Sequence, residues 1–144
     1  MTLDQWNRLL QTNITSMFLT CRAAVPLFLR QGGGSILNVS SVWGTAGASC
    51  EAAYSASKGA VNAFTKALGK ELAPSKIRVN AIAFGAIDTS MNRFLSPEER
   101  ADLEEEIPAG RFGTTAEAGA LIADIALNHP YLTAQVLTMD GGWI

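Results

Sequence analysis

The residues best suited to chemistry are a tyrosine and a lysine four positions apart, Tyr54 and Lys58, with Ser41 thirteen residues before the tyrosine. On a helix, positions i and i+4 lie on one face, so the two side chains would stack. A cation beside a phenol stabilises the phenolate, and we therefore expect the pKa of Tyr54 to lie below its usual value of about 10. Such a phenol suits general acid–base catalysis near neutral pH. The Ser41 hydroxyl could hold a carbonyl or alcohol oxygen against it.

Tyr-x-x-x-Lys is a weak signal alone, but other motifs accompany it. Asn13 begins Asn-x-x-x-x-Phe, and Ser41 ends Asn-Val-Ser-Ser after a strand-like run. A further run from Asn80 to Thr89 follows the next predicted strand, and Asp-Gly-Gly-Trp ends at Trp143. With these ordered motifs, the chain resembles the short-chain dehydrogenase/reductases, of the type that includes β-ketoacyl-carrier-protein reductases.

The resemblance implies a role for each of four catalytic residues. Tyr54 would protonate the carbonyl oxygen as hydride reaches the carbon, and Ser41 would orient that oxygen. Lys58 would bond the nicotinamide ribose hydroxyls and lower the pKa of Tyr54. Asn13 would hold a water that links Lys58 to solvent.

The cofactor implied by the resemblance is NAD(P)H, and the choice between NAD and NADP stays open. Tyr54 and Lys58 would contact it, as would the loop after the second strand, to which Gly85 belongs. There the backbone of Ile87 would meet the nicotinamide carboxamide, and Thr89 would approach the phosphates. The reactivity belongs to the nicotinamide, whereas the protein supplies position and a proton.

Three neighbouring residues are candidates for a substrate pocket. Trp43 and Cys50 flank the loop between the serine and the tyrosine, and each could equally serve packing alone. Glu51 could bind a cationic substrate group, or it could be a surface residue. Short strings around these residues are similar to reductases that act on the 5-aminopentanone modification of bacterial elongation factor P. The implied function is therefore oxidoreduction of a carbonyl or secondary alcohol, such as 3-oxoacyl-carrier-protein reduction, with 5-aminopentanone reduction as the alternative.

The elements that must position these residues alternate between helices and strands. Apolar periodicity and helix start signals predict helices at 2–30, 52–73, 96–106 and 114–127, and strands at 35–40, 76–83 and 134–139. Capping boxes begin three of the helices, at Thr2, Ser96 and Thr114. Pro26 should bend the first helix near its end. This order of elements predicts an α/β fold with a parallel sheet.

Two segments have a distinct interpretation. Residues 88–113 are charged and irregular, and we interpret them as a lid over a site, with a solvated connection as the alternative. The glycines at 32–34 precede a strand, whereas a phosphate-binding loop needs glycines between a strand and a helix. They should therefore form a turn.

The chain matches only part of the family's fold, because nothing near its start fits the Gly-x-x-x-Gly-x-Gly loop. We expect a partial Rossmann-like, doubly wound parallel sheet, made of the last three strands with flanking helices and lacking the N-terminal dinucleotide-binding half. Residues 1–144 would be a single domain, the C-terminal catalytic portion, with an exposed edge on the first strand. Phe84 and Ala134 depart from the family's usual proline and glycine.

Composition narrows the possible partners. A net charge of −2 without a basic run argues against nucleic acid, and no apolar run is long enough to span a membrane. Two cysteines, Cys21 and Cys50, indicate reduced thiols and a cytoplasmic location. The only histidine, His129, has no partner at ligand spacing, so no metal site is expected.

The expected substrate is a small-molecule or carrier-linked carbonyl compound. Family resemblance also suggests a homo-oligomer built on the helices that carry Asn13 and Tyr54. A hypothesis of another class is that the chain is a truncated, non-catalytic association module that uses the same helices.

Overall fold

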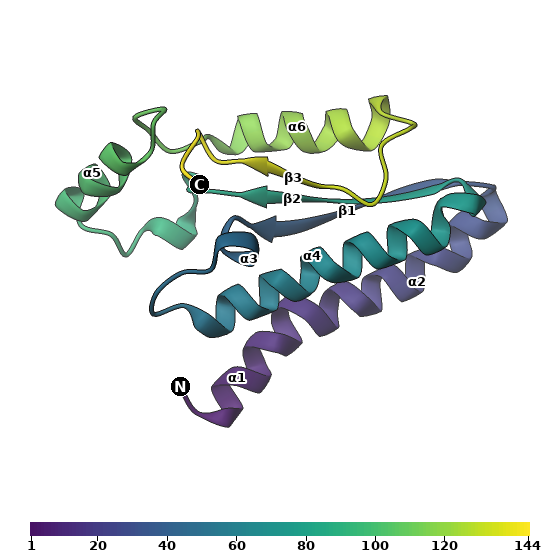
Figure 1. The fold of residues 1–144 in the computed structure, drawn as a ribbon, viewed down its shortest axis with the longest axis horizontal. Coiled ribbons are helices and arrows are strands. Elements are labelled where there is room, and N and C mark those ends of the chain that lie inside the picture. The colour runs from purple at the N-terminus through teal and green to yellow at the C-terminus, as the bar shows by residue number, and fades with distance from the viewer.

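The structure, a computed structural model, describes residues 1–144 as a parallel sheet covered by helices on both faces (Figure 1). The strands β1 (Gly34–Ser41), β2 (Ile77–Phe84) and β3 (Val136–Met139) lie in the order β1-β2-β3. Helices α2 and α4 cover one face, and α6 covers the other. The predicted α/β fold, a partial doubly wound sheet of three parallel strands, is therefore confirmed.

The helices are α1 (Leu3–Leu10), α2 (Ser16–Gln31), α3 (Trp43–Ala46), α4 (Ala52–Leu72), α5 (Pro97–Glu106) and α6 (Thr115–Asn128). Short 3₁₀ turns occupy Ala73–Ser75 and Ser90–Asn92. All three predicted capping boxes form, with Thr2, Ser96 and Thr114 as the N-cap residues. Local side-chain chemistry thus sets where α1, α5 and α6 begin.

The first long helix has an irregularity that the sequence analysis did not predict. A π-helical turn at Gln11–Thr15 separates α1 from α2. The chain continues as α-helix through Pro26 to Gln31, and a bend at Pro26 stays a prediction. Gly32 ends the helix with φ of 80°, a left-handed conformation that glycine adopts without a steric penalty. The short helix α3 was also not predicted; it lies within the expected loop at 42–51.

Strand β2 is the centre of the core. Its residues Ile77, Val79, Ala81 and Ile82 are completely buried, as expected for the central strand of a parallel sheet covered on both faces. The register pairs Ser41 with Phe84 on the neighbouring strand, and Phe84 with Met139. The carboxyl ends of all three strands therefore meet at one edge of the sheet, where ligands bind in open α/β folds.

The substitution at Ala134 is accommodated with some strain. Ala134 has φ of 60°, in the left-handed region where a Cβ costs about 1–2 kcal/mol. Its amide donates to the Val79 carbonyl at 2.8 Å, which holds this backbone conformation beside the central strand.

At the other edge of the sheet, β1 pairs only with β2, so it presents the exposed edge that was expected.

Candidate active site

Tyr54 and Lys58 lie in the first two turns of α4, on one face, as their spacing predicts. The Lys58 ammonium stands over the Tyr54 ring, 5.7 Å from its centroid. It also donates a hydrogen bond of 3.1 Å to the Val39 carbonyl of β1. These contacts bring Lys58, Tyr54 and the edge strand β1 together.

The pKa of Tyr54 moves in the opposite direction from the one predicted. Burial of the phenol raises its pKa, the neighbouring Ser41 hydroxyl lowers it, and the Glu51 carboxylate raises it further. The net result is a pKa above the usual 10.0. The prediction was wrong because it did not count the desolvation of the phenol, which is the largest influence on its pKa. Burial likewise lowers the pKa of Lys58.

Ser41 lies at the carboxyl end of β1 and is buried, with 7% of its surface exposed. Its Oγ accepts a hydrogen bond of 3.3 Å from the Trp43 amide, so the hydroxyl proton remains free to be donated. The hydroxyl is near enough to Tyr54 to lower the pKa of the phenol, although no well-aligned hydrogen bond joins the two groups. The structure thus brings Ser41 and Tyr54 to one place from two different elements.

Asn13 lies in the π-helical turn between α1 and α2. Its amide donates to Ser57 Oγ at 2.9 Å, and the Ser57 hydroxyl donates to the Tyr54 carbonyl at 2.7 Å. Asn13 therefore reaches the tyrosine's helix through a protein hydroxyl, which the sequence analysis missed. A water that links Asn13 to Lys58 stays a prediction.

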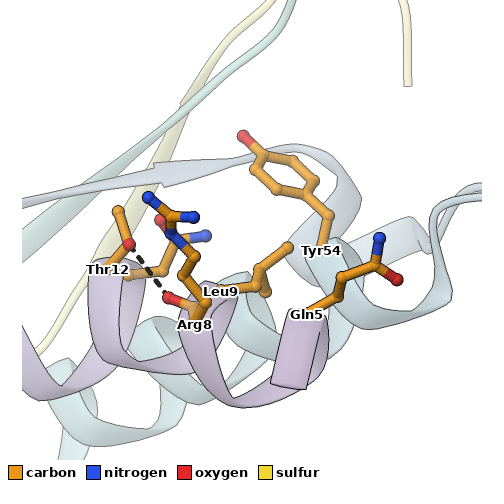
Figure 2. A pocket seen from close by; sticks show the side chains of 6 residues that line it. Gln5, Arg8, Leu9, Thr12 and Tyr54 are labelled. Carbon is orange, nitrogen blue, oxygen red and sulfur yellow. Dashed lines mark hydrogen bonds between the residues drawn. The ribbon is translucent and has the colours of Figure 1, made fainter. Parts of the chain in front are cut away.

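An open hollow of about 370 Å³ lies beside this cluster. Figure 2 shows the Tyr54 ring above residues of α1 and the π-helical turn, with the Arg8 guanidinium on the side nearest the phenol. No carboxylate lines the hollow, whose six lining residues are Gln5, Arg8, Leu9, Thr12, Asn13 and Tyr54. The phenol is therefore accessible to a molecule that enters from this side.

The loop after β2 contains the predicted cofactor residues. The Gly85 amide donates to the Met139 carbonyl at 3.0 Å, and a Cβ on Gly85 would come within 2.7 Å of Asp140, so this position requires glycine. The Ile87 carbonyl accepts from Asn92 at 2.7 Å, whereas its amide N–H has no acceptor within the protein. Thr89 is exposed, and its hydroxyl accepts from the Met91 amide.

The three pocket candidates have different surroundings. Trp43 packs edge-to-face on Trp143, with ring centroids 4.8 Å apart, so the Asp-Gly-Gly-Trp motif lies against the loop that follows Ser41. Cys50 is an exposed free thiol with φ of 65°. Glu51 is exposed at the N-terminus of α4, and its charge acts on Tyr54. A substrate contact stays a prediction for each of them.

Buried polar side chains join α4 to β1, and none of these pairs was predicted. The Ser40 hydroxyl donates to the side-chain amide oxygen of Asn62 (Oδ1) at 2.6 Å and lies 3.3 Å from the backbone carbonyl oxygen of Lys58. Deeper in the core, Asn38 donates to Thr65 at 2.9 Å. No buried side-chain nitrogen or oxygen lacks a partner. These contacts fix α4 on the sheet. The only feature of the sequence that could have indicated them is the recurrence of a polar residue every few positions along α4.

The predicted lid, residues 88–113, is held by ion pairs at its surface and by two buried apolar side chains. Arg100 pairs with Asp88 at 3.1 Å and with Glu104 at 2.9 Å, and its guanidinium lies 4.5 Å from the centre of the Phe112 ring. Ile107 and Phe112 are its buried apolar residues. A closing motion stays a prediction.

Comparison with known proteins places the chain in a family. A family profile described as enoyl-(acyl carrier protein) reductase matches residues 1–144. A 3-oxoacyl-[acyl-carrier-protein] reductase of Homo sapiens is 45% identical over 133 residues, which are 92% of this chain and 54% of the relative. The chain belongs to the short-chain dehydrogenase/reductase family. An uncharacterized oxidoreductase of Bacillus subtilis, YmfI, is 43% identical over 94% of the chain and 56% of its own length.

Solved structures agree. A 3-oxoacyl-[acyl-carrier protein] reductase from Brucella melitensis superposes with a TM-score of 0.93 at 35% identity, over all of this chain and 55% of that one. A gluconate 5-dehydrogenase from Burkholderia cenocepacia, solved with NADP and tartrate, gives 0.94 at 29% identity, over 99% of this chain and 57% of that one. The chain thus spans about half the length of the relatives it matches.

Two further features concern partners. No helix combines the length and apolar content needed to cross a bilayer. No group of three or more His, Cys, Asp or Glu side chains is arranged to hold a metal ion.

Proposed function

We propose that the chain supplies the proton-transfer residues of an NAD(P)(H)-dependent oxidoreductase that acts on a carbonyl or secondary alcohol, such as a 3-oxoacyl-carrier-protein. One observation carries the proposal: the Tyr54 phenol lies near both the Ser41 hydroxyl and the Lys58 ammonium, and it lines an open hollow. The 3-oxoacyl-[acyl-carrier-protein] reductases among the relatives support this substrate class.

The available donors fit a nicotinamide dinucleotide. The Ile87 amide N–H has no protein acceptor, and the Lys58 ammonium is bonded to a carbonyl rather than paired with a carboxylate. These groups would hold the carboxamide and the ribose hydroxyls, respectively. When bound, the reduced cofactor supplies the hydride that forms the new carbon–hydrogen bond.

The protein's own residues move the proton. As the carbonyl π bond breaks, the oxygen takes the proton of Tyr54, and the resulting phenolate is stabilised by Lys58. Ser41 can donate to the same oxygen, because its hydroxyl proton is not used within the protein. Since the pKa of Tyr54 is raised, the phenol is protonated at neutral pH, which favours its role as an acid in reduction.

The test is reduction of a 3-oxoacyl thioester by NADPH or NADH, comparing the wild type with Tyr54→Phe. General acid catalysis contributes about 10²- to 10⁴-fold, so we expect a loss of turnover in that range. Cofactor binding, followed by nicotinamide fluorescence, should be retained because the phenol's packing surface remains. Undiminished turnover in the variant would exclude Tyr54 as the acid.

A second candidate substrate is the 5-aminopentanone group of elongation factor P. The observation that favours it is Glu51, whose carboxylate is close enough to Tyr54 to raise the pKa of the phenol and could bind a substrate amino group. Competition between an amino ketone and a 3-oxoacyl thioester decides between them through the ratio of their kcat/KM values. A ratio of kcat/KM values that favours the thioester by tenfold or more would exclude the amino ketone as the preferred substrate.

A role in association is the remaining hypothesis. Four large apolar side chains of α2 are half exposed: Phe18, Leu19, Leu27 and Leu29. They support a homo-oligomer built on the Asn13 and Tyr54 helices. Sedimentation equilibrium measures its mass, and an absence of saturable cofactor binding at millimolar concentration would leave association as the only function of this chain.

A further inference from the structure

Helix α4, which carries Tyr54 and Lys58, begins without a side-chain cap. Helices α1, α5 and α6 all start with capping boxes, whereas the N-cap residue of α4, Glu51, makes no such hydrogen bond. An uncapped first turn leaves amide groups without helical partners and is prone to fray. Tyr54 lies in this turn, so other contacts must fix it.

Ser57 makes such a contact from inside the helix. It is completely buried, and its hydroxyl uses both of its hydrogen-bonding capacities. It donates to the Tyr54 carbonyl at 2.7 Å and accepts from the Asn13 amide at 2.9 Å. The backbone of the first turn is thereby joined to a residue 44 positions away from Ser57 in the sequence.

The other end of this link lies in the π-helical turn at Gln11–Thr15. Such turns are rare and occur frequently at functional sites, since they redirect side chains that a regular helix would aim elsewhere. Here the turn contains Asn13, whose amide reaches Ser57. A distortion in one helix is therefore connected to the backbone of the catalytic tyrosine in another.

We propose that Ser57 is a positioning residue: it transmits the placement of Asn13 to the first turn of α4 and so holds the Tyr54 phenol at the substrate. The proposal rests on the proposed function of Tyr54 as the proton donor. Without the Ser57 hydroxyl, the Asn13 amide loses its acceptor, and the uncapped turn loses its tie to the π-helical turn. The phenol should then become more mobile and more exposed to water.

The experiment is carbon-13 NMR of the chain with tyrosine labelled at Cζ. The chain has two tyrosines, and Tyr131 is fully exposed, so Tyr131→Phe assigns the signals. Because burial raises the pKa of Tyr54, Ser57→Ala should lower that pKa toward the ordinary value of a phenol. Asn13→Ala should act in the same direction, and it should add nothing in the Ser57→Ala background, because both variants break one link.

Thr65→Val is the matched control. Thr65 is also completely buried on α4, and it accepts a hydrogen bond of 2.9 Å from Asn38, more than one turn beyond the catalytic residues. Its loss should destabilise the fold comparably and leave the Tyr54 signal unchanged. In the active protein we expect kcat to fall about tenfold in Ser57→Ala, with KM unchanged, because misplaced catalytic groups lower turnover.

Three results would overturn the proposal. The first is a Tyr54 signal that responds equally to Ser57→Ala and Thr65→Val, and the second is effects of Asn13→Ala and Ser57→Ala that simply add. The third is a Tyr54 signal that does not move in Asn13→Ala; because Asn13 is only half-buried, this variant tests the link even if Ser57→Ala fails to fold. The NMR comparison needs no substrate. A wild type that reduces no carbonyl compound would therefore refute the proposed function while the role of Ser57 was still decided.

Discussion

Two regions of the molecule are held in place by different polar contacts. The contact between α4 and β1, which carries Ser41, Tyr54 and Lys58, contains buried neutral hydrogen bonds such as Ser40 to Asn62. The segment 88–113 buries Ile107 and Phe112, but its polar side-chain contacts are ion pairs at the surface, centred on Arg100.

The difference follows from what each contact contributes. Buried hydrogen bonds are costly to break, because a partner left unpaired loses solvation without compensation. Exposed ion pairs contribute little to stability, because water and salt screen them. The first kind of contact therefore holds Ser41, Tyr54 and Lys58 firmly in place, whereas the second can break at little cost in stability. The following predictions test this contrast.

The largest effect should come from separating α3 from α4. Gly44→Ala would place a Cβ 2.6 Å from the Lys58 carbonyl carbon, and backbone cannot yield as a flexible side chain can. We expect a loss of about 3 kcal/mol in the free energy of unfolding. Urea denaturation monitored by circular dichroism measures it.

Gly119→Ala is the matched control for this substitution. Gly119 lies within α6 with no atom near its absent Cβ, so alanine there should stabilise the protein by about 0.5–1 kcal/mol. If both variants shifted stability equally, close packing at Gly44 would not be what fixes the catalytic helix.

Loosening the segment 88–113 should have a smaller effect, confined to that segment. Arg100→Gln removes both ion pairs, and we expect faster hydrogen exchange in 88–113 with an unchanged global unfolding transition. In the wild type, acid should likewise break the Arg100–Asp88 ion pair and speed hydrogen exchange in 88–113. Arg100 lowers the pKa of Asp88 from 3.8, so the contact is present above that pH and is lost as the pH falls through the lowered value.

The other end of the segment should resist acid until the pH is very low. Arg111 and the Thr114 cap lower the pKa of Glu117 to about 2, so the Arg111–Glu117 pair should persist until the pH falls near that value. Hydrogen exchange corrected for intrinsic rates follows each end of the segment separately. A global transition that moved together with the local exchange would show that the segment is part of the core.

The smallest effect should come from the one charge that acts on the buried region. The Glu51 carboxylate raises the pKa of Tyr54, although less than burial does. Glu51→Gln should therefore lower that pKa slightly, as followed by phenolate absorbance in a Tyr131→Phe background. Glu98→Gln on α5 serves as the control, and an equal response would mean that the effect is not local.

Much of the fold was predictable because its signals are local. The capping boxes at Thr2, Ser96 and Thr114 define helix starts within four residues of sequence. The apolar and β-branched residues of β2 likewise indicate a strand. By contrast, α3 has only four residues and no cap, and the π-helical turn has no local signature.

The relative placement of Tyr54 and Lys58 was predictable, whereas the direction of the Tyr54 pKa shift was not. The spacing of Tyr54 and Lys58 is enough to place them on one face of a helix. The pairing of Ser57 with Asn13 depends on two distant segments meeting, which no local pattern encodes. The direction of the Tyr54 pKa shift depends on how much water the fold excludes, and that is a property of the tertiary structure.

The π-helical turn at Gln11–Thr15 also determines the helical phase of everything before it. A π-helical turn holds one residue more than a regular α-helical turn, and each residue advances an α-helix by about 100°. If the same residues formed a regular α-helix throughout, α1 would be rotated by roughly that angle relative to α2, and Trp6 would face a different side while Tyr54 stayed where it is. Deleting one residue of this turn would instead allow a regular ladder with α1 in its present orientation, so the extra residue itself sets which side chains of α1 meet the phenol.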